Sequence, residues 1–379
     1  MLASICIIIV LTYLILISWL NNGFNKIKDF TLQDLEPRTK FSVIIPFRNE
    51  AENLPILLKS IENLNYPNSH FEVILVDDES EDASLKVIEI FRQKTRNNSS
   101  QHIKIIKNHR TSNSPKKDAI ATAIKIVKYD WIITTDADCV LSKYWLDSYD
   151  EFIQSHKASA IAGPVKFTGF SSFFTRFQIL DTLSLQGATI GSFGIKKPLM
   201  CNGANFAYSK NGFEQVNGYE GNDNIASGDD VFLLQKLLEK DNSKVYFLKS
   251  ENAIVTTRVT NGFTEYLQQR LRWASKTTSY KSLFPKFLGL IVLLTNLVMV
   301  SVIPLYILEI LQGKTAVLLF LIKFSIDLLL IFKTARFYKQ EPVLLSYVFA
   351  SFIYPFITIY ITVILPFLSF KWKGRTFKR

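Results

Sequence analysis

The chain has 379 residues, of which 48% are hydrophobic and 20% are charged, and its formal net charge at pH 7 is +11. This apolar and aromatic content excludes a disordered chain, and the ordinary glycine and proline counts exclude a collagen-like or low-complexity one. Cys6, Cys139 and Cys201 are far apart and show no CxxC spacing, which excludes a disulfide scaffold.

An uncharged apolar segment at the start of the chain predicts a membrane anchor. Residues 2–20 carry no charged side chain, and about 20 apolar residues cross a bilayer as a helix. No Lys or Arg precedes the segment and the residues around Ser18 make a poor cleavage site, so we interpret it as an uncleaved anchor rather than a signal peptide.

The C-terminal third contains three more apolar segments, at residues 287–308, 316–332 and 343–370. In the second of these, Lys323 and Asp327 are four residues apart, so on a helix they share a face and can pair. The simpler interpretation is a structural ion pair, and the alternative is a role in a substrate path.

Basic residues predict the orientation in the membrane. Four of them follow the first segment between positions 26 and 40, which favours a cytoplasmic location for the central region. Residues 371–379 carry five positive charges and no acid, which also favours the cytoplasm. Three simple crossings would leave this tail outside, so either residues 343–370 fold back at their prolines or one segment is re-entrant. A basic tail beside an apolar segment indicates contact with anionic lipid rather than with nucleic acid.

Residues 41–281 alternate between short apolar runs and amphipathic stretches. The runs at 41–46, 71–76, 102–106 and 131–135 predict strands, and the stretches at 50–64, 82–95 and 116–127 predict helices. This alternation predicts an α/β domain with a parallel sheet buried on both faces, which binds ligands at the carboxyl ends of its strands.

Pairs of acidic residues follow two of the predicted strands. Asp136 and Asp138 are two apart, so on extended backbone their carboxylates point to the same side. Such oxygen ligands can hold Mg²⁺ together with substrate phosphates, and the alternative is an ordinary turn. Asp77 and Asp78 also have two interpretations. They could contact the base or ribose of a nucleotide, or they could begin a turn with Ser80.

Two further charged pairs stand next to predicted helices. Lys116 and Lys117 begin a helix, where a lysine can reach a phosphate or simply remain solvated. Asp229 and Asp230 precede the apolar-periodic residues 231–238, where they either cap the helix or supply a general base.

Gln269, Arg272 and Trp273 share one face of an amphipathic helix expected over residues 263–280. One interpretation is an interfacial helix with its tryptophan at the membrane boundary. The other is a cytoplasmic lid, in which the tryptophan stacks on a sugar ring and the arginine approaches a diphosphate.

Six motifs occur in one order: SVIIPFRNE (42–50), VDDES (76–80), PKKDA (115–119), TDADC (135–139), SGDDVFLL (227–234) and QRLRW (269–273). Together they resemble the membrane-bound glycosyltransferases of family 2, of the QxxRW type. Within that family the similarity is to synthases of cellulose, chitin, hyaluronan and poly-N-acetylglucosamine and to ceramide glucosyltransferases. It covers roughly residues 41–281 and implies a GT-A fold, which is a Rossmann-like α/β domain, joined to transmembrane helices.

The resemblance also implies roles for individual residues. The general base falls on Asp230, with Asp229 as its neighbour. The residues implied in donor binding are Pro46, Arg48, Glu50, Asp77, Asp78, Lys116 and Asp136. The ligands implied for Mg²⁺ or Mn²⁺ are Asp136 and Asp138. The residues implied on the acceptor side and lid are Asn202, Gly203, Gln269, Arg272 and Trp273.

The sequence departs from the family pattern at two places. The acidic pair is usually Glu-Asp, and here Asp229 is one methylene shorter than the usual first residue. The loop before Lys116 has Ser114-Pro115 where the family commonly has glycine.

We therefore expect five segments: an anchor (1–22), a cytoplasmic GT-A domain (38–262), an interfacial helix (263–283), transmembrane helices (284–370) and a basic cytoplasmic tail (371–379). The expected protein is a multi-pass enzyme of the cytoplasmic (inner) membrane, metal-dependent and inverting. It would transfer a sugar from a nucleotide sugar, more commonly UDP- than GDP-linked, to a lipid or glycan. The alternatives are a processive polysaccharide synthase, for which an accessory membrane subunit would complete a pore, and a non-catalytic scaffold of polysaccharide export.

Overall fold

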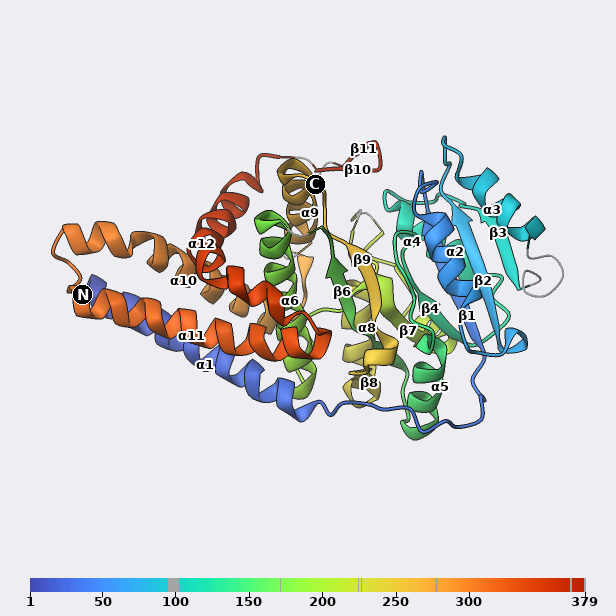
Figure 1. The fold of residues 1–379 in the computed structure, drawn as a ribbon, viewed down its shortest axis with the longest axis horizontal. Helices are drawn as coiled ribbons and strands as arrows, with labels where there is room; N and C mark the ends of the chain where they lie inside the picture. Colours follow the sequence, from blue (N-terminus) through green and yellow to red (C-terminus); the bar gives the residue numbers. More distant parts are fainter. Residues whose placement is uncertain are drawn as a thin grey trace.

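The computed structural model describes residues 1–94, 102–170, 172–223, 225, 227–276, 279–368 and 370–377. Figure 1 shows an α/β body beside a group of long helices, with the N-terminus at the end of these helices that is remote from the sheet. The predicted combination of an α/β domain with apolar helices is confirmed.

The main sheet has seven strands in the order β3-β2-β1-β4-β7-β5-β8. Their bounds are β1 Phe41–Phe47, β2 Phe71–Asp77, β3 Ile103–Lys107, β4 Trp131–Thr134, β5 Ala160–Ala162, β7 Phe206–Ser209 and β8 Val245–Phe247. Strands β1 to β4 pair in parallel as predicted, but β7 is antiparallel to both β4 and β5, so the sheet is mixed. A second sheet pairs β6 (Val165–Thr168) with β9 (Val255–Arg258).

The antiparallel pairing has a consequence for the site. Thr134, the last residue of β4, is opposite Phe206, the first residue of β7. The short helix η2 (Gly203–Asn205) that precedes β7 therefore lies at the carboxyl edge of the parallel strands. Sequence periodicity does not reveal this return, because the direction of β7 is set by its pairing with β4 and β5, which are distant in sequence.

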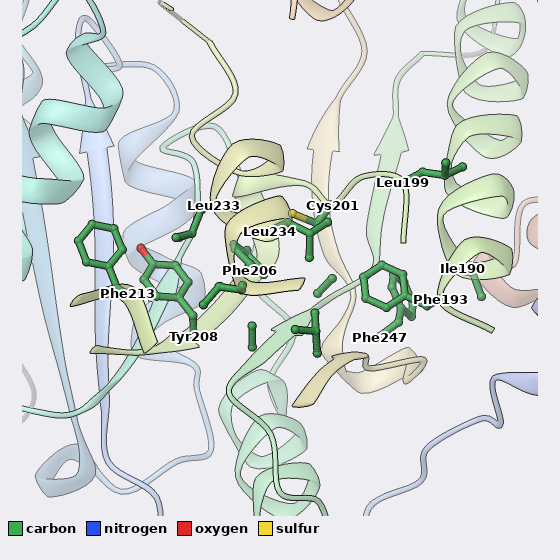
Figure 2. Close-up of a cluster of buried hydrophobic side chains, with 14 of the residues drawn as sticks. Ile190, Phe193, Leu199, Cys201, Phe206, Tyr208, Phe213, Leu233, Leu234 and Phe247 are labelled. Carbon is green, nitrogen blue, oxygen red and sulfur yellow. The ribbon is translucent and has the colours of Figure 1, made fainter. Parts of the chain in front are cut away.

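Helices cover both faces of the sheet. Those of the α/β body are α2 (Leu54–Glu62), α3 (Ser84–Lys94), α4 (Pro115–Ile124), α5 (Trp145–Ser155), α6 (Phe173–Gly194), α7 (Lys210–Gln215), α8 (Val231–Asp241) and α9 (Phe263–Ser275). Along β1, Val43 and Ile45 belong to one hydrophobic cluster and Ile44 to another, as expected for a strand buried on both sides. Figure 2 shows the second cluster, where Phe206 of β7 packs beside Leu234 of α8.

Four helices are long and apolar enough to cross a membrane. They are α1 (Leu2–Lys26), α10 (Leu283–Ile307), α11 (Gly313–Tyr338) and α12 (Tyr347–Ile364), the last continuing a 3-10 helix, η6 (Glu341–Ser346). The anchor α1 packs closely on α6, because a Cβ added at Gly23 would lie 2.1 Å from the carbonyl oxygen of Gly191. Small residues of this kind let two helix backbones approach, which ties the anchor to the α/β body.

Both ends of α12 lie beside the α/β body. Just before it, Gln340 Nε2 donates a hydrogen bond of 2.8 Å to the carbonyl oxygen of Phe167. After it, a hairpin of β10 (Phe370–Trp372) and β11 (Arg375–Phe377) returns to the sheet edge, where Arg375 contacts Asp78. The helix is continuous through Pro355, so the segment does not fold back there. Residues at both ends of this helix therefore contact the α/β body.

Candidate active site

Side chains from four loops meet in a small cavity at the carboxyl edge of the sheet. Its volume is about 120 Å³. The predicted donor-side and lid residues that line it are Pro46, Arg48, Glu50, Asp78, Lys116, Asp136, Asp138 and Arg272. The parallel strands β1, β2 and β4 end at this edge, which explains why motifs so distant in sequence converge.

The two aspartates after β2 have different surroundings. The Asp77 carboxylate accepts a hydrogen bond of 3.0 Å from the backbone N–H of Ser80, so it forms the turn that was its simpler interpretation. The Asp78 carboxylate lines the cavity and accepts a hydrogen bond of 2.7 Å from Asn108. Arg110 lies 3.2 Å from the same oxygen. The sequence analysis missed Asn108 and Arg110, since neither belongs to a motif.

The loop after β1 supports that turn. Arg48 donates to the carbonyl oxygen of Asp78 at 2.8 Å and pairs with Glu81 at 2.7 Å. Its guanidinium therefore stabilises the loop that follows β2. Glu50 is buried, and its carboxylate accepts a hydrogen bond of 2.7 Å from Asn53.

Lys116 links the donor-side carboxylates to the acidic pair. Its Nζ lies 2.6 Å from Asp136 Oδ1 and 3.1 Å from Asp229 Oδ2. Burial lowers the pKa of Lys116, but the charges of Asp136, Asp229 and Asp230 outweigh it and raise the pKa overall. The ammonium therefore stays charged, and Asp229 has a clear partner despite its shorter side chain.

Lys117 does not face the cavity. Its Nζ donates to the carbonyl oxygens of Asn222 at 2.5 Å and Ile225 at 2.8 Å. The side chain is buried, and this burial lowers its pKa to about 8. Lys117 thus anchors the loop before α8 rather than forming the solvated pair considered from sequence.

Asp136 and Asp138 provide a donor set suited to a hard divalent cation. Asp138 is exposed at the rim of the cavity, and desolvation by the surrounding protein together with the charges of Asp136 and Glu50 raises its pKa to about 6. A raised carboxyl pKa marks a site of excess negative charge, which a cation would relieve. The described residues contain no group of three or more metal-binding side chains, so further ligands would come from substrate phosphates or water.

Asp230 is held on three sides at the start of α8. Its carboxylate accepts hydrogen bonds from the backbone N–H groups of Val231 at 2.7 Å and Gly203 at 3.1 Å, and it pairs with Lys276 at 3.2 Å. Burial raises its pKa, but the charges of Lys276 and Lys116 outweigh this and leave the pKa below its ordinary value. Asp230 thus caps the helix and is also an ionised carboxylate in the site.

The Asn202-Gly203 loop is fixed against the acidic pair. Thr134 at the end of β4 donates a hydrogen bond of 2.9 Å to the carbonyl oxygen of Gly203. A Cβ at Gly203 would lie 2.7 Å from Asp229 Oδ2 and 3.1 Å from Lys116 Nζ. The Asn202 side chain closes η2 by accepting a hydrogen bond from Ala204 N–H at 3.0 Å. A side chain here would have to displace the Asp229 carboxylate and the Lys116 ammonium.

Helix α9 presents different residues to two cavities. Arg272 lines the donor-side cavity, whereas Trp273 lines a second cavity together with Asp230 and Asn202. Gln269 is partly buried and is not among the described residues that line either one. The helix predicted to reach residue 280 ends at Ser275, and residues 277–278 lie outside the described ranges.

Two residues of the basic tail, Lys373 and Arg375, contact acidic residues on the donor side. Lys373 pairs with Glu50 and lines the cavity, and Arg375 pairs with Asp78. Arg375 also lies 2.8 Å from Glu79. The contact was not predictable from sequence, because nothing in the tail indicates which acidic residues it would reach.

Two family models match the chain. Glycosyl transferase family 2 matches residues 42–216, and Glycosyl transferase family group 2 matches residues 131–370.

Several curated proteins match the chain in sequence. The poly(ribitol-phosphate) β-N-acetylglucosaminyltransferase TarS of Staphylococcus aureus is 30% identical over 122 residues, which is 32% of this chain and 20% of that protein. The poly-β-1,6-N-acetyl-D-glucosamine synthase of Staphylococcus epidermidis is 24% identical over 238 residues, which is 62% of this chain and 53% of that protein. The chain thus spans less than two thirds of either relative.

One solved structure matches over nearly its whole length. The mannosyltransferase PcManGT from Pyrobaculum calidifontis, solved with GDP-Man and Mn²⁺, has a TM-score of 0.60 at 16% identity, covering 93% of this chain and 99% of that one. This likeness confirms the predicted GT-A fold. Since the family group 2 model spans well over half of the sequence, the chain belongs to the family 2 glycosyltransferases.

Proposed function

We propose that this protein is an inverting, metal-dependent glycosyltransferase that moves a sugar from a nucleotide sugar to an acceptor hydroxyl at the membrane. The observation that carries this proposal is the position of Asp230. Its neighbour Asp229 shares Lys116 with Asp136 on the donor side, and Asp230 itself lines the second cavity, which extends to α12.

The donor-side cavity is the proposed nucleotide-sugar site. Asp78 would contact the base, and Lys116 would face the diphosphate once Asp136 is engaged by a cation. Asp136 and Asp138 would hold Mg²⁺ or Mn²⁺, which when bound neutralises charge on the leaving diphosphate. PcManGT contains Mn²⁺ and GDP-Man, whereas the family resemblance favours UDP, so both nucleotides belong in the test.

Asp230 is the proposed general base. Its lowered pKa keeps it ionised at neutral pH, so it can accept the proton of the acceptor hydroxyl as that oxygen attacks the anomeric carbon. Lys276 holds the carboxylate in place from the side of α9. Attack from the face opposite the leaving group inverts the anomeric centre.

We also propose that the α/β body faces the cytoplasm of a multi-pass inner-membrane protein. The basic residues between positions 26 and 40 support this orientation. The contacts that residues before and after α12 make with the α/β body support it as well, because they place the tail beside the sheet.

The test is nucleoside diphosphate release by detergent-purified protein with Mn²⁺ or Mg²⁺ and a native lipid extract. The donors are UDP-glucose, UDP-galactose, UDP-N-acetylglucosamine and GDP-mannose. We expect release with one donor, loss with EDTA and with Asp138→Asn, and a fall of about 10²–10⁴-fold with Asp230→Asn. Release that persists in Asp230→Asn would move the base to another residue. Failure to bind either nucleotide by calorimetry would contradict the proposed function itself.

A further inference from the structure

Two cavities adjoin one another behind Asp230. The first is the second cavity described above, of about 320 Å³, which reaches from Cys201, Asn202 and Asp230 to Ile357 and Ile361 of α12. The other, of about 280 Å³, lies between α1, α6, α10 and α11. The residues that line both are Asp181, Leu185, Met200, Tyr280 and Tyr354. The two cavities therefore adjoin, and together they extend from the proposed base into the group of apolar helices; we call the pair of cavities the path.

The walls of this path are largely apolar. The inner cavity is lined by side chains such as Ile17, Leu20, Leu288 and Val292, from helices that are apolar enough to cross a membrane. A sugar placed there would lose hydration of its hydroxyl groups without enough partners, which costs free energy for each group. A hydrocarbon chain loses nothing of this kind and gains from leaving water.

Arg270 lies at the junction with free hydrogen-bond donors. It is 7% exposed and lines the outer cavity, between the rings of Tyr266 and Trp273. Its Nη2 pairs with Asp181 at 2.8 Å, and Tyr266 donates to the same carboxylate at 2.9 Å. Its Nε and Nη1 are buried and have no hydrogen-bond partner among the described residues. Buried donors of this kind are normally satisfied, so they point to an oxygen supplied by a ligand.

The charges around the junction balance. Asp181 neutralises Arg270, and Lys276 neutralises Asp230. The junction therefore offers N–H donors without a net positive charge, which suits an uncharged oxygen, such as a carbonyl or hydroxyl, better than a phosphate.

We propose that the acceptor is an uncharged lipid alcohol with a carbonyl oxygen near its hydroxyl, held with its head at Asp230 and Arg270 and its hydrocarbon chain in the two cavities. This inference rests on the proposed function and narrows its acceptor. The hydroxyl oxygen forms the new bond to the anomeric carbon, and its proton passes to Asp230. The bond from that carbon to the diphosphate breaks, and its electron pair leaves with the nucleoside diphosphate.

The test uses the full-length protein, with dioleoylglycerol as the probe and whichever of the four nucleotide sugars supports nucleoside diphosphate release in the assay above. Arg270→Lys keeps a positive charge beside Asp181 but removes the two free N–H groups. We expect KM for the lipid to rise about tenfold, as for the loss of one or two hydrogen bonds, while the Kd of the nucleotide stays unchanged. Leu185→Trp should obstruct the junction and abolish transfer to the lipid, whereas Leu321→Trp on an exposed part of α11 should not.

Three results would overturn the inference while leaving the proposed function intact. They are product that stays in the aqueous phase as a polymer, transfer only to a polyprenyl phosphate, and an unchanged lipid KM in Arg270→Lys. Loss of nucleotide binding in the unmodified protein would instead contradict the proposed function. Because nucleotide binding is measured without lipid, the two failures are distinguishable.

Discussion

The protonation of Asp230 depends on Lys276, which lies 3.2 Å away. Burial alone would raise the pKa of this carboxyl. The positive charges of Lys276 and Lys116 have the larger effect, so the pKa is lowered overall. Lys276→Met should therefore raise the pKa of Asp230. Since a general base must be ionised, the acid limb of the kcat profile should move to higher pH, and activity at mildly acidic pH should fall.

The measurement is the pH dependence of kcat at saturating donor for the wild type and Lys276→Met. Lys281→Met, which changes an exposed lysine nearby in sequence, is the control and should leave the limb unmoved. An acid limb that is identical in Lys276→Met would show that the titrating group is not Asp230.

Gly203 is a residue whose substitution has a direct steric consequence. The added methyl of Gly203→Ala would meet Asp229 and Lys116, so either these side chains shift or the loop moves and lengthens the hydrogen bond from Gly203 N–H to Asp230. We expect kcat to fall at least tenfold. Overpacking should also lower the free energy of unfolding by about 1–3 kcal/mol, as measured by thermal unfolding. Gly289→Ala, where nothing lies within 4 Å, is the matched control. Unchanged kcat in Gly203→Ala would mean that this loop does not set the position of Asp230.

At the level of elements, α11 is joined to α1 and α12 by a buried polar cluster. Lys323 pairs with Asp327 at 2.7 Å as predicted, and Tyr13 of α1 donates to Asp327 at 2.5 Å. Lys323→Ala would leave the carboxylate buried without its cation, which typically costs about 3–5 kcal/mol. The double variant Lys323→Leu/Asp327→Leu should recover part of that loss, as measured by thermal unfolding in detergent.

The same pair distinguishes the two interpretations drawn from sequence. Both residues line the inner cavity, so a role in a substrate path would make the double variant inactive even when it is stable. A purely structural pair would leave transfer intact in the double variant, which is the outcome we expect.

Local patterns were sufficient to predict the strands β1 to β4 and the carboxylates at their ends. Each of these strands is a short apolar run followed at once by polar residues, so periodicity locates it. The antiparallel β7 was not predictable, because its position depends on pairing with β4 and β5 across some 70 and 40 intervening residues.

Arg270 was missed for a related reason. It occupies a variable position of QRLRW, and only its tertiary contact with Asp181 identifies it.

For the molecule as a whole, the C-terminal hairpin joins the membrane helices to the donor-side cavity. Arg375 pairs with Asp78, the residue proposed to contact the nucleotide base, so the two interactions compete. Arg375→Ala should lower the Kd for UDP by up to about fivefold, because a partly exposed ion pair contributes about that factor to an equilibrium constant. Arg258→Ala, at an exposed position of β9, is the control. Calorimetry with Mn²⁺ measures the change, and weaker binding would show that the hairpin supports the nucleotide instead.

The continuity of α12 with this hairpin has a thermodynamic consequence. One continuous stretch of chain lines the lipid path through Tyr354 and Ile357 and then contacts the donor-side carboxylates through Lys373 and Arg375. If filling the path displaces the hairpin, acceptor binding lowers the Kd of the donor, and linkage requires the donor to lower the Kd of the acceptor by the same factor. Neither substrate alone would then bind at full strength, so a donor without an acceptor would be protected from hydrolysis by water.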